Sequence, residues 1–96
     1  MKEEKDLSAL FISRIGENIT KKRKEKKLSL EKFGLEIGLT RMQVFRIEQG
    51  YNITVKTLLK IALALDLKPE ELVKFDYRIK RDDLERLLNS KKATKK

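Results

Sequence analysis

The sequence predicts an all-α fold, and three of its features support this class. Apolar residues recur three and four positions apart over most of the chain, which is the period of helices that bury one face. Only four glycines and one proline occur among 96 residues, too few for the many turns of a β-rich fold. Serine or threonine precedes several of the apolar segments, where a helix N-cap is expected.

The first predicted helix spans about residues 7–26. Its apolar residues recur every four positions: Leu7, Phe11, Ile15 and Ile19. Gly16 lies within it and weakens the helix by about 1 kcal/mol relative to alanine, so we expect a close helix–helix contact at this glycine. A basic run over 21–27 would end the helix, where cations suit the negative end of the helix dipole.

Three further helices are expected over about 30–37, 41–49 and 55–65. Each follows a residue that can cap a helix N-terminus: Ser29, Thr40 and Thr54. Gly38 and Gly50 can end the first two of these helices, because glycine adopts a positive φ without strain.

The C-terminal quarter carries weaker signals. Pro69 suits the first position of a fifth helix. The apolar contacts of that helix would come from Leu72, Val73 and Phe75. Leucines at positions 84, 87 and 88 predict an extra amphipathic helix over about 81–89. The polar and basic residues 90–96 are expected to be disordered.

The composition excludes several kinds of chemistry. The chain contains no cysteine and no histidine, which excludes disulfides, thiolate zinc sites and imidazole catalysis, so no metal or cofactor is expected. No glycine-rich phosphate loop or paired carboxylate site follows from the spacing, so no catalytic residue is assigned and an enzyme is not expected. The charged segment 1–6 is typical of neither a signal peptide nor a membrane span, and we expect a cytoplasmic protein.

The formal net charge of +9 narrows the class of partner. A charge of this size and sign favours polyanions, with nucleic acid first and an anionic membrane second. A surface that merely keeps the protein soluble is the plain alternative. No predicted helix combines a basic face with a bulky aromatic face, which argues against a membrane partner.

Residues 30–49 fit a helix-turn-helix. A small residue, Gly34, stands where the second helix would cross the first, and Gly38 supplies the positive φ that the turn requires. Apolar side chains that can pack between the two helices come from both helices and from the turn: Phe33, Ile37, Leu39, Val44 and Ile47. Such a motif places its second helix in the major groove of DNA.

A wider set of residues extends this pattern along the chain: Ile15-Gly16, Ile19, Arg23, Leu28-Ser29, Gly34, Gly38, Val44, Ile47, Glu48, Gly50, Asn52-Ile53-Thr54, Lys56-Thr57-Leu58, Lys60-Ile61-Ala62 and Ala64-Leu65. Over about 15–75, two thirds of the chain, the sequence resembles the Cro/phage-repressor (XRE-type) helix-turn-helix family. The loop at 52–54 is similar to that of restriction-modification controller proteins, without fixing the subfamily.

The resemblance implies a five-helix, lambda-repressor-like DNA-binding domain, followed here by a short C-terminal helix. Residues 1–10 would extend the first helix, 11–76 would form the helix-turn-helix domain, and 77–96 would be a charged C-terminal extension. It also implies a transcription regulator that binds double-stranded DNA as a homodimer on two-fold-related half-sites.

The predicted third helix supplies the expected base contacts. With Val44 and Ile47 inward, this helix exposes Arg41, Met42, Gln43, Phe45, Arg46 and Gln49, and the first five of these are the expected base contacts. In the family, the first, second and sixth residues of this helix commonly contact bases. An arginine can bond guanine O6 and N7 together, which is worth about 1–3 kcal/mol of discrimination. A solvated helix face is the plain alternative for the two arginines.

Backbone contacts are expected at the starts of helices and in the loop that follows the third helix: Ser29, Thr40, Asn52, Thr54, Lys56 and Thr57. For the three N-caps among them, capping alone is an equally good account, and one residue can do both. The resemblance further implies an ion pair between Arg23 and Glu48, beneath the DNA-facing surface.

The sequence departs from the family pattern at several positions. Leu30 stands where a glutamine often contacts DNA, which puts one contact in doubt. Lys32 replaces the usual glutamate, so the capping box of Ser29 is incomplete. Lys27 stands where glycine often ends the first helix, and a non-glycine residue in the left-handed region costs about 1–2 kcal/mol.

A second class of function remains open beside the regulator. The same fold can serve as a protein-interaction module, either an antitoxin-like protein or a coactivator-like bridge. Residues 77–89, rich in leucine and charge, would then bind an additional protein partner. Loss of DNA binding on replacement of Arg41 and Arg46, with the protein complex intact, would separate the two readings.

Overall fold

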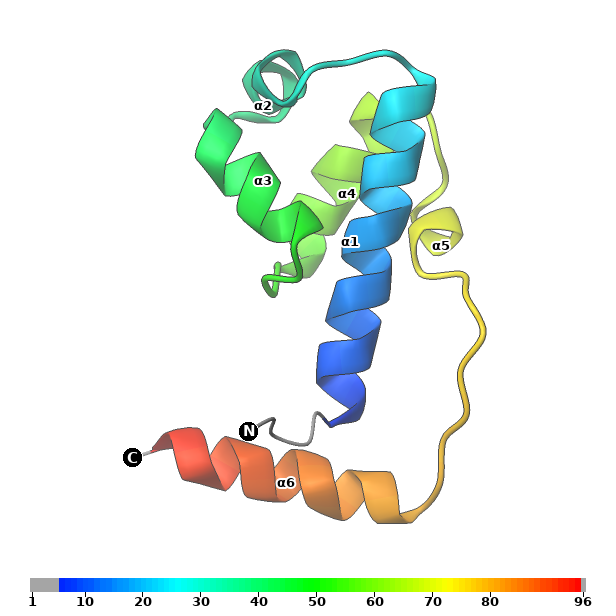
Figure 1. Cartoon of the computed structure of the whole chain (residues 1–96), viewed down its shortest axis with the longest axis vertical. Helices are drawn as coiled ribbons and strands as arrows, with labels where there is room; N and C mark the ends of the chain where they lie inside the picture. The colour runs from blue at the N-terminus through cyan, green and yellow to red at the C-terminus, as the bar shows by residue number, and fades with distance from the viewer. Residues whose placement is uncertain (1–5, 96) are drawn as a thin grey trace.

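The computed structural model describes residues 6–95, which form six helices and no strand. The helices are α1 (Leu7–Glu25), α2 (Leu30–Ile37), α3 (Arg41–Glu48), α4 (Val55–Ala64), α5 (Pro69–Leu72) and α6 (Asp82–Lys95). α3 and α5 both contact the long helix α1, while α4 contacts α2 and α5 (Figure 1). The predicted all-α class is confirmed.

Local capping explains where the helices of the first two thirds begin. The side chains of Ser29, Thr40 and Thr54 each accept the backbone N–H three residues further on, at 3.0 to 3.1 Å. These bonds satisfy N–H groups that have no partner inside a helix. Gly38 then ends α2 with a φ of 76°, in the left-handed region. Lys27 is also left-handed, with a φ of 57°, as its place after α1 suggested.

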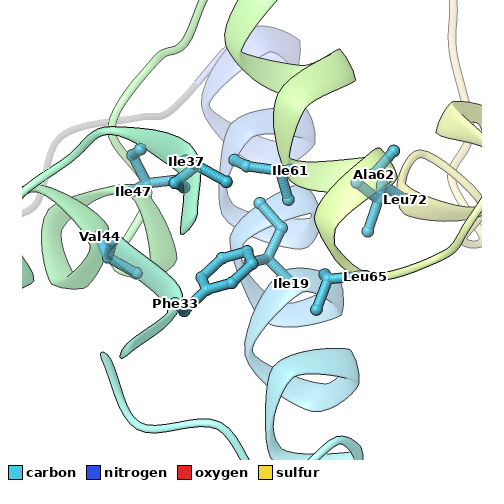
Figure 2. Close-up of a cluster of buried hydrophobic side chains, with 9 residues drawn as sticks. All are labelled: Ile19, Phe33, Ile37, Val44, Ile47, Ile61, Ala62, Leu65 and Leu72. Atoms are coloured by element: carbon cyan, nitrogen blue, oxygen red, sulfur yellow. The ribbon is translucent and has the colours of Figure 1, made fainter. Parts of the chain in front are cut away.

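A single apolar core contains residues from each of the helices α1, α2, α3, α4 and α5. Its buried members are Ile19, Phe33, Ile37, Val44, Ile47, Ile61, Ala62, Leu65 and Leu72 (Figure 2). Phe33 and Ile19 lie together at its centre, and both are fully buried. Full burial of a side chain of this size stabilises the fold by about 1.5–3 kcal/mol, so the core fixes how the short helices sit on α1.

Two glycines permit close approaches of the backbone that the fold requires. A Cβ atom on Gly16 would lie 2.6 Å from the Glu48 carbonyl oxygen, so α1 and α3 touch at this point. A Cβ atom on Gly34 would lie 2.5 Å from the Leu39 carbonyl oxygen, in the turn between α2 and α3. The predicted close contact at Gly16 is confirmed, and any larger residue at either site would push backbone apart.

The C-terminal part differs from the sequence prediction. α5 is a single turn that ends at Leu72, and residues 74–80 form no regular secondary structure. Phe75 therefore packs from outside a helix, edge-to-face on Phe11 with ring centroids 4.9 Å apart, and Tyr77 packs on Phe11 at 4.7 Å. Asn18 Nδ2 also donates to the Leu72 carbonyl at 2.9 Å.

α6 crosses near the N-terminal end of α1, which it contacts (Figure 1). The helix continues past Asn89 to Lys95, through the segment for which the sequence predicted disorder. Lysine and alanine are good helix formers, and cations suit a helix C-terminus. None of the described helices is long and apolar enough to cross a membrane.

Candidate nucleic-acid interface

The turn between α2 and α3 is built from glycine and one backbone bond. Gly38 takes the left-handed conformation, and the Leu39 N–H donates to the Gly34 carbonyl at 2.8 Å. The space left by the missing side chain of Gly34 holds the Leu39 carbonyl. These contacts start α3 at a fixed position relative to α2, and α3 begins at Arg41 after the Thr40 cap.

The predicted base-contact residues all lie on the exposed surface of α3: Arg41, Met42, Gln43, Phe45 and Arg46. Val44 and Ile47 are 1% and 9% exposed and face the core, as expected from the helical period. Met42 and Phe45 keep 47% and 43% of their surface exposed. An outward helix face that carries large apolar side chains beside arginines is suited to a partner with both polar edges and methyl groups.

Gln43 also has a structural role. Its Oε1 accepts the Thr40 N–H at 2.9 Å while the Thr40 hydroxyl accepts the Gln43 N–H, which completes a reciprocal capping box. A threonine followed three residues later by glutamine is the sequence pattern of this box. Gln43 can therefore cap α3 whether or not it also contacts DNA.

A hollow of about 350 Å³ separates the exposed side of α3 from the start of α4. Its lining brings together predicted base and backbone contacts with neighbouring side chains: Leu39, Gln43, Arg46, Ile47, Tyr51, Asn52, Ile53, Thr54 and Thr57. Lys56 is exposed beside it on the first turn of α4. Ser29 and Thr40 are exposed at the starts of α2 and α3 and do not line this hollow.

Arg23 and Glu48 join α1 to the last turn of α3. Arg23 Nε donates to Glu48 Oε2 at 2.7 Å, and Nη2 donates to Oε1 at 3.1 Å. Arg23 Nη1 donates to the Leu28 carbonyl at 2.7 Å. The two residues are 7% and 8% exposed. The two-bond pairing of a planar guanidinium with a carboxylate is directional, so it orients α3 as well as holding it.

Tyr51 also lines the hollow between α3 and the start of α4, although the sequence pattern does not predict it as a site residue. The Cζ atom of Arg46 lies over the Tyr51 ring, 6.0 Å from its centroid. Gly50, with a φ of 110°, precedes Tyr51 at the end of α3. Only the position of an aromatic residue directly after this glycine could have indicated the contact, and that signal is weak.

The helix-turn-helix family model matches residues 19–72. The crystal structure of the restriction-modification controller protein C.AhdI from Aeromonas hydrophila is similar with a TM-score of 0.61 and 35% identity, over 64% of this chain and 94% of that chain. A search among curated proteins found no match.

A second solved structure, the hypothetical transcription factor NHTF from Neisseria, is similar with a TM-score of 0.63. The alignment covers 91% of this chain and 95% of that chain at 22% identity, so this likeness concerns the fold alone. The family match covers more than half of the chain and includes α2, α3 and the turn between them. The chain belongs to the Cro/phage-repressor (XRE-type) helix-turn-helix family, whose members are DNA-binding transcription regulators.

Proposed function

We propose that this protein is a sequence-specific transcription regulator that inserts α3 into the major groove of its operator. The observation that carries the proposal is the outward face of α3, where Arg41 and Arg46 stand exposed on a helix that Arg23 and Glu48 hold from beneath. Rigid support matters because base contacts require donors at fixed positions. The similarity to a restriction-modification controller protein supports the same class of function.

The spacing of Arg41 and Arg46 along α3 is suited to contacts in the major groove of DNA. They are five residues apart, which corresponds to a rise of about 7.5 Å along a helix. Base pairs in DNA are about 3.4 Å apart, so the two side chains would contact different base pairs within one half-site. Each arginine would add about 1–3 kcal/mol of discrimination if it bonds a guanine at two positions.

The backbone contacts would come from the helix starts that flank α3. The exposed hydroxyls of Ser29, Thr40 and Thr54 cap their helices, and an oxygen that caps can also bond a phosphate. Thr57 and Asn52 line the hollow beside Arg46, and Lys56 adds a positive charge at its edge. A DNA strand along this hollow would meet the positive end of the α4 dipole.

The homodimer is part of the proposal. Leu72, the apolar residue at the end of α5, is fully buried in the core of its own chain and is not available for a contact between copies. Among the exposed apolar residues, Ile79, Leu84 and Leu88 lie close together in the sequence after α5 and keep half or more of their surface exposed. We therefore place the contact between copies on residues 77–89. The same surface would bind a different protein in an antitoxin-like or coactivator-like module.

Selection of binding sites from a random duplex library tests this proposal. The selection is made at about 150–200 mM salt, where nonspecific attraction to phosphates weakens and specific binding persists. We expect an inverted repeat with half-sites about 34 Å apart. Binding without any enriched sequence would refute the proposed function, and the search would turn to a protein partner of residues 77–89.

A further inference from the structure

The end of α3 brings an aromatic ring against the last arginine of that helix. Gly50 turns the chain with a φ of 110°, and the Tyr51 N–H donates to the Arg46 carbonyl at 3.1 Å. This backbone bond fixes where Tyr51 leaves α3. The Cζ atom of Arg46 then lies over the ring, 6.0 Å from its centroid. The backbone hydrogen bond of Tyr51 therefore helps to set the position of its ring, in addition to the contact with Arg46.

Arg46 has no carboxylate partner in the part of the chain that the structure describes, where all three salt bridges involve other residues. An exposed arginine without a partner samples many rotamers, and ordering it on a ligand lowers affinity. The negative face of an aromatic ring attracts a guanidinium and restricts it without neutralising its charge. The five donors of Arg46 would remain available to a base.

We propose that Tyr51 is a positioning residue for Arg46 and so determines how strongly one base pair is selected. The inference rests on the proposed function, because it requires Arg46 to contact a base. Both side chains line the hollow between α3 and the start of α4, on the side where the DNA backbone would run. Tyr51 holds the guanidinium at the α3 side of that hollow.

The experiment compares Tyr51→Phe, Tyr51→Leu and Arg46→Ala with the wild-type protein, by site selection and by affinity for the selected duplex. Tyr51→Phe keeps the ring, so its selected sequence and affinity should match wild type. Tyr51→Leu removes the ring but keeps an apolar side chain. It should weaken binding about two- to fivefold, and the preference should relax at one base pair only. That base pair is the one whose preference is lost in Arg46→Ala.

Two further variants separate positioning from other roles. In the Arg46→Ala background, Tyr51→Leu should change nothing more, because the side chain it positions is already gone. Asn52→Ala, in the same loop, is the matched control. It should weaken binding to all sequences about equally without changing the selected bases.

Each result has a definite meaning. If Tyr51→Leu selects the same bases as strongly as wild type, the inference is overturned while the proposed function stands. If Tyr51→Phe weakens binding to every duplex as much as Tyr51→Leu does, the hydroxyl contacts phosphate and the positioning role is wrong. If the wild-type protein itself selects no sequence, the proposed function fails and this inference fails with it.

Discussion

Replacement of Glu48 by alanine should destabilise the fold strongly. Arg23 is only 7% exposed, and the change leaves its guanidinium with the Leu28 carbonyl as its one remaining partner. Removal of one member of a buried ion pair costs about 3–5 kcal/mol. For a domain of this size, 1 kcal/mol shifts the midpoint of thermal unfolding by about 4–8 °C. The expected decrease in Tm is therefore roughly 12–40 °C.

An exposed pair of the same length provides the control. Lys26 Nζ and Asp66 Oδ2 are also 2.7 Å apart, but the two side chains are 40% and 79% exposed. Asp66→Asn removes the charge and keeps a residue that tolerates the positive φ of 60° at this position. Because exposed pairs contribute about 0–1 kcal/mol, the decrease in Tm should be only a few degrees.

Thermal unfolding followed by circular dichroism measures both variants. The double variant Arg23→Met with Glu48→Met should be less destabilised than Glu48→Ala, because no charge remains buried without a partner. The reasoning is refuted if Glu48→Ala costs no more than Asp66→Asn, or if the double variant is less stable than Glu48→Ala.

Three other predictions follow from the same structure. Gly34→Ala should cost about 1–3 kcal/mol through overpacking against the Leu39 carbonyl. Gly38→Ala meets no atom within 4 Å and should cost only the strain of its φ of 76°, about 1–2 kcal/mol. Urea unfolding measures both variants, and a Gly34→Ala protein as stable as wild type would contradict the prediction. Lys56→Ala should weaken binding to all duplexes and lower the slope of log affinity against log salt by about 1. An unchanged slope would contradict a contact between Lys56 and a phosphate. Leu84→Glu with Leu88→Glu should convert a dimer to a monomer in sedimentation with an unchanged helical signal, and a persistent dimer would place the interface elsewhere.

The elements with local signals were predictable from the sequence. The starts of α2, α3 and α4 depend on the caps Ser29, Thr40 and Thr54, and the end of α2 depends on Gly38. Each of these is a contact within a few residues of the chain. The observed bounds therefore lie within one residue of those expected from the sequence.

The C-terminal part depends on contacts that no local pattern contains. The irregular segment after α5 is held by Phe11 and Asn18, more than fifty residues earlier in the chain. Helical periodicity cannot reveal such pairs, so the apolar spacing predicts that Phe75 belongs to the fifth helix, whereas α5 ends at Leu72. In the site, the helical period of the apolar residues predicts which face of α3 is exposed. The contact between the Tyr51 ring and Arg46 follows a turn of the backbone at Gly50, which has a positive φ, and the sequence pattern does not contain this contact.

The central claim is that the exposed arginines of α3 contact guanines in the major groove. It is tested most directly by the affinity for operator duplexes in which single guanines are replaced by 7-deazaguanine, which removes the N7 acceptor from that groove alone. We predict a loss of about 0.5–1.5 kcal/mol at the guanine that Arg46 contacts, because one of the two hydrogen bonds is removed, and no further loss there for Arg46→Ala. Unchanged affinity at every guanine, for a protein that still selects the operator, would contradict the claim.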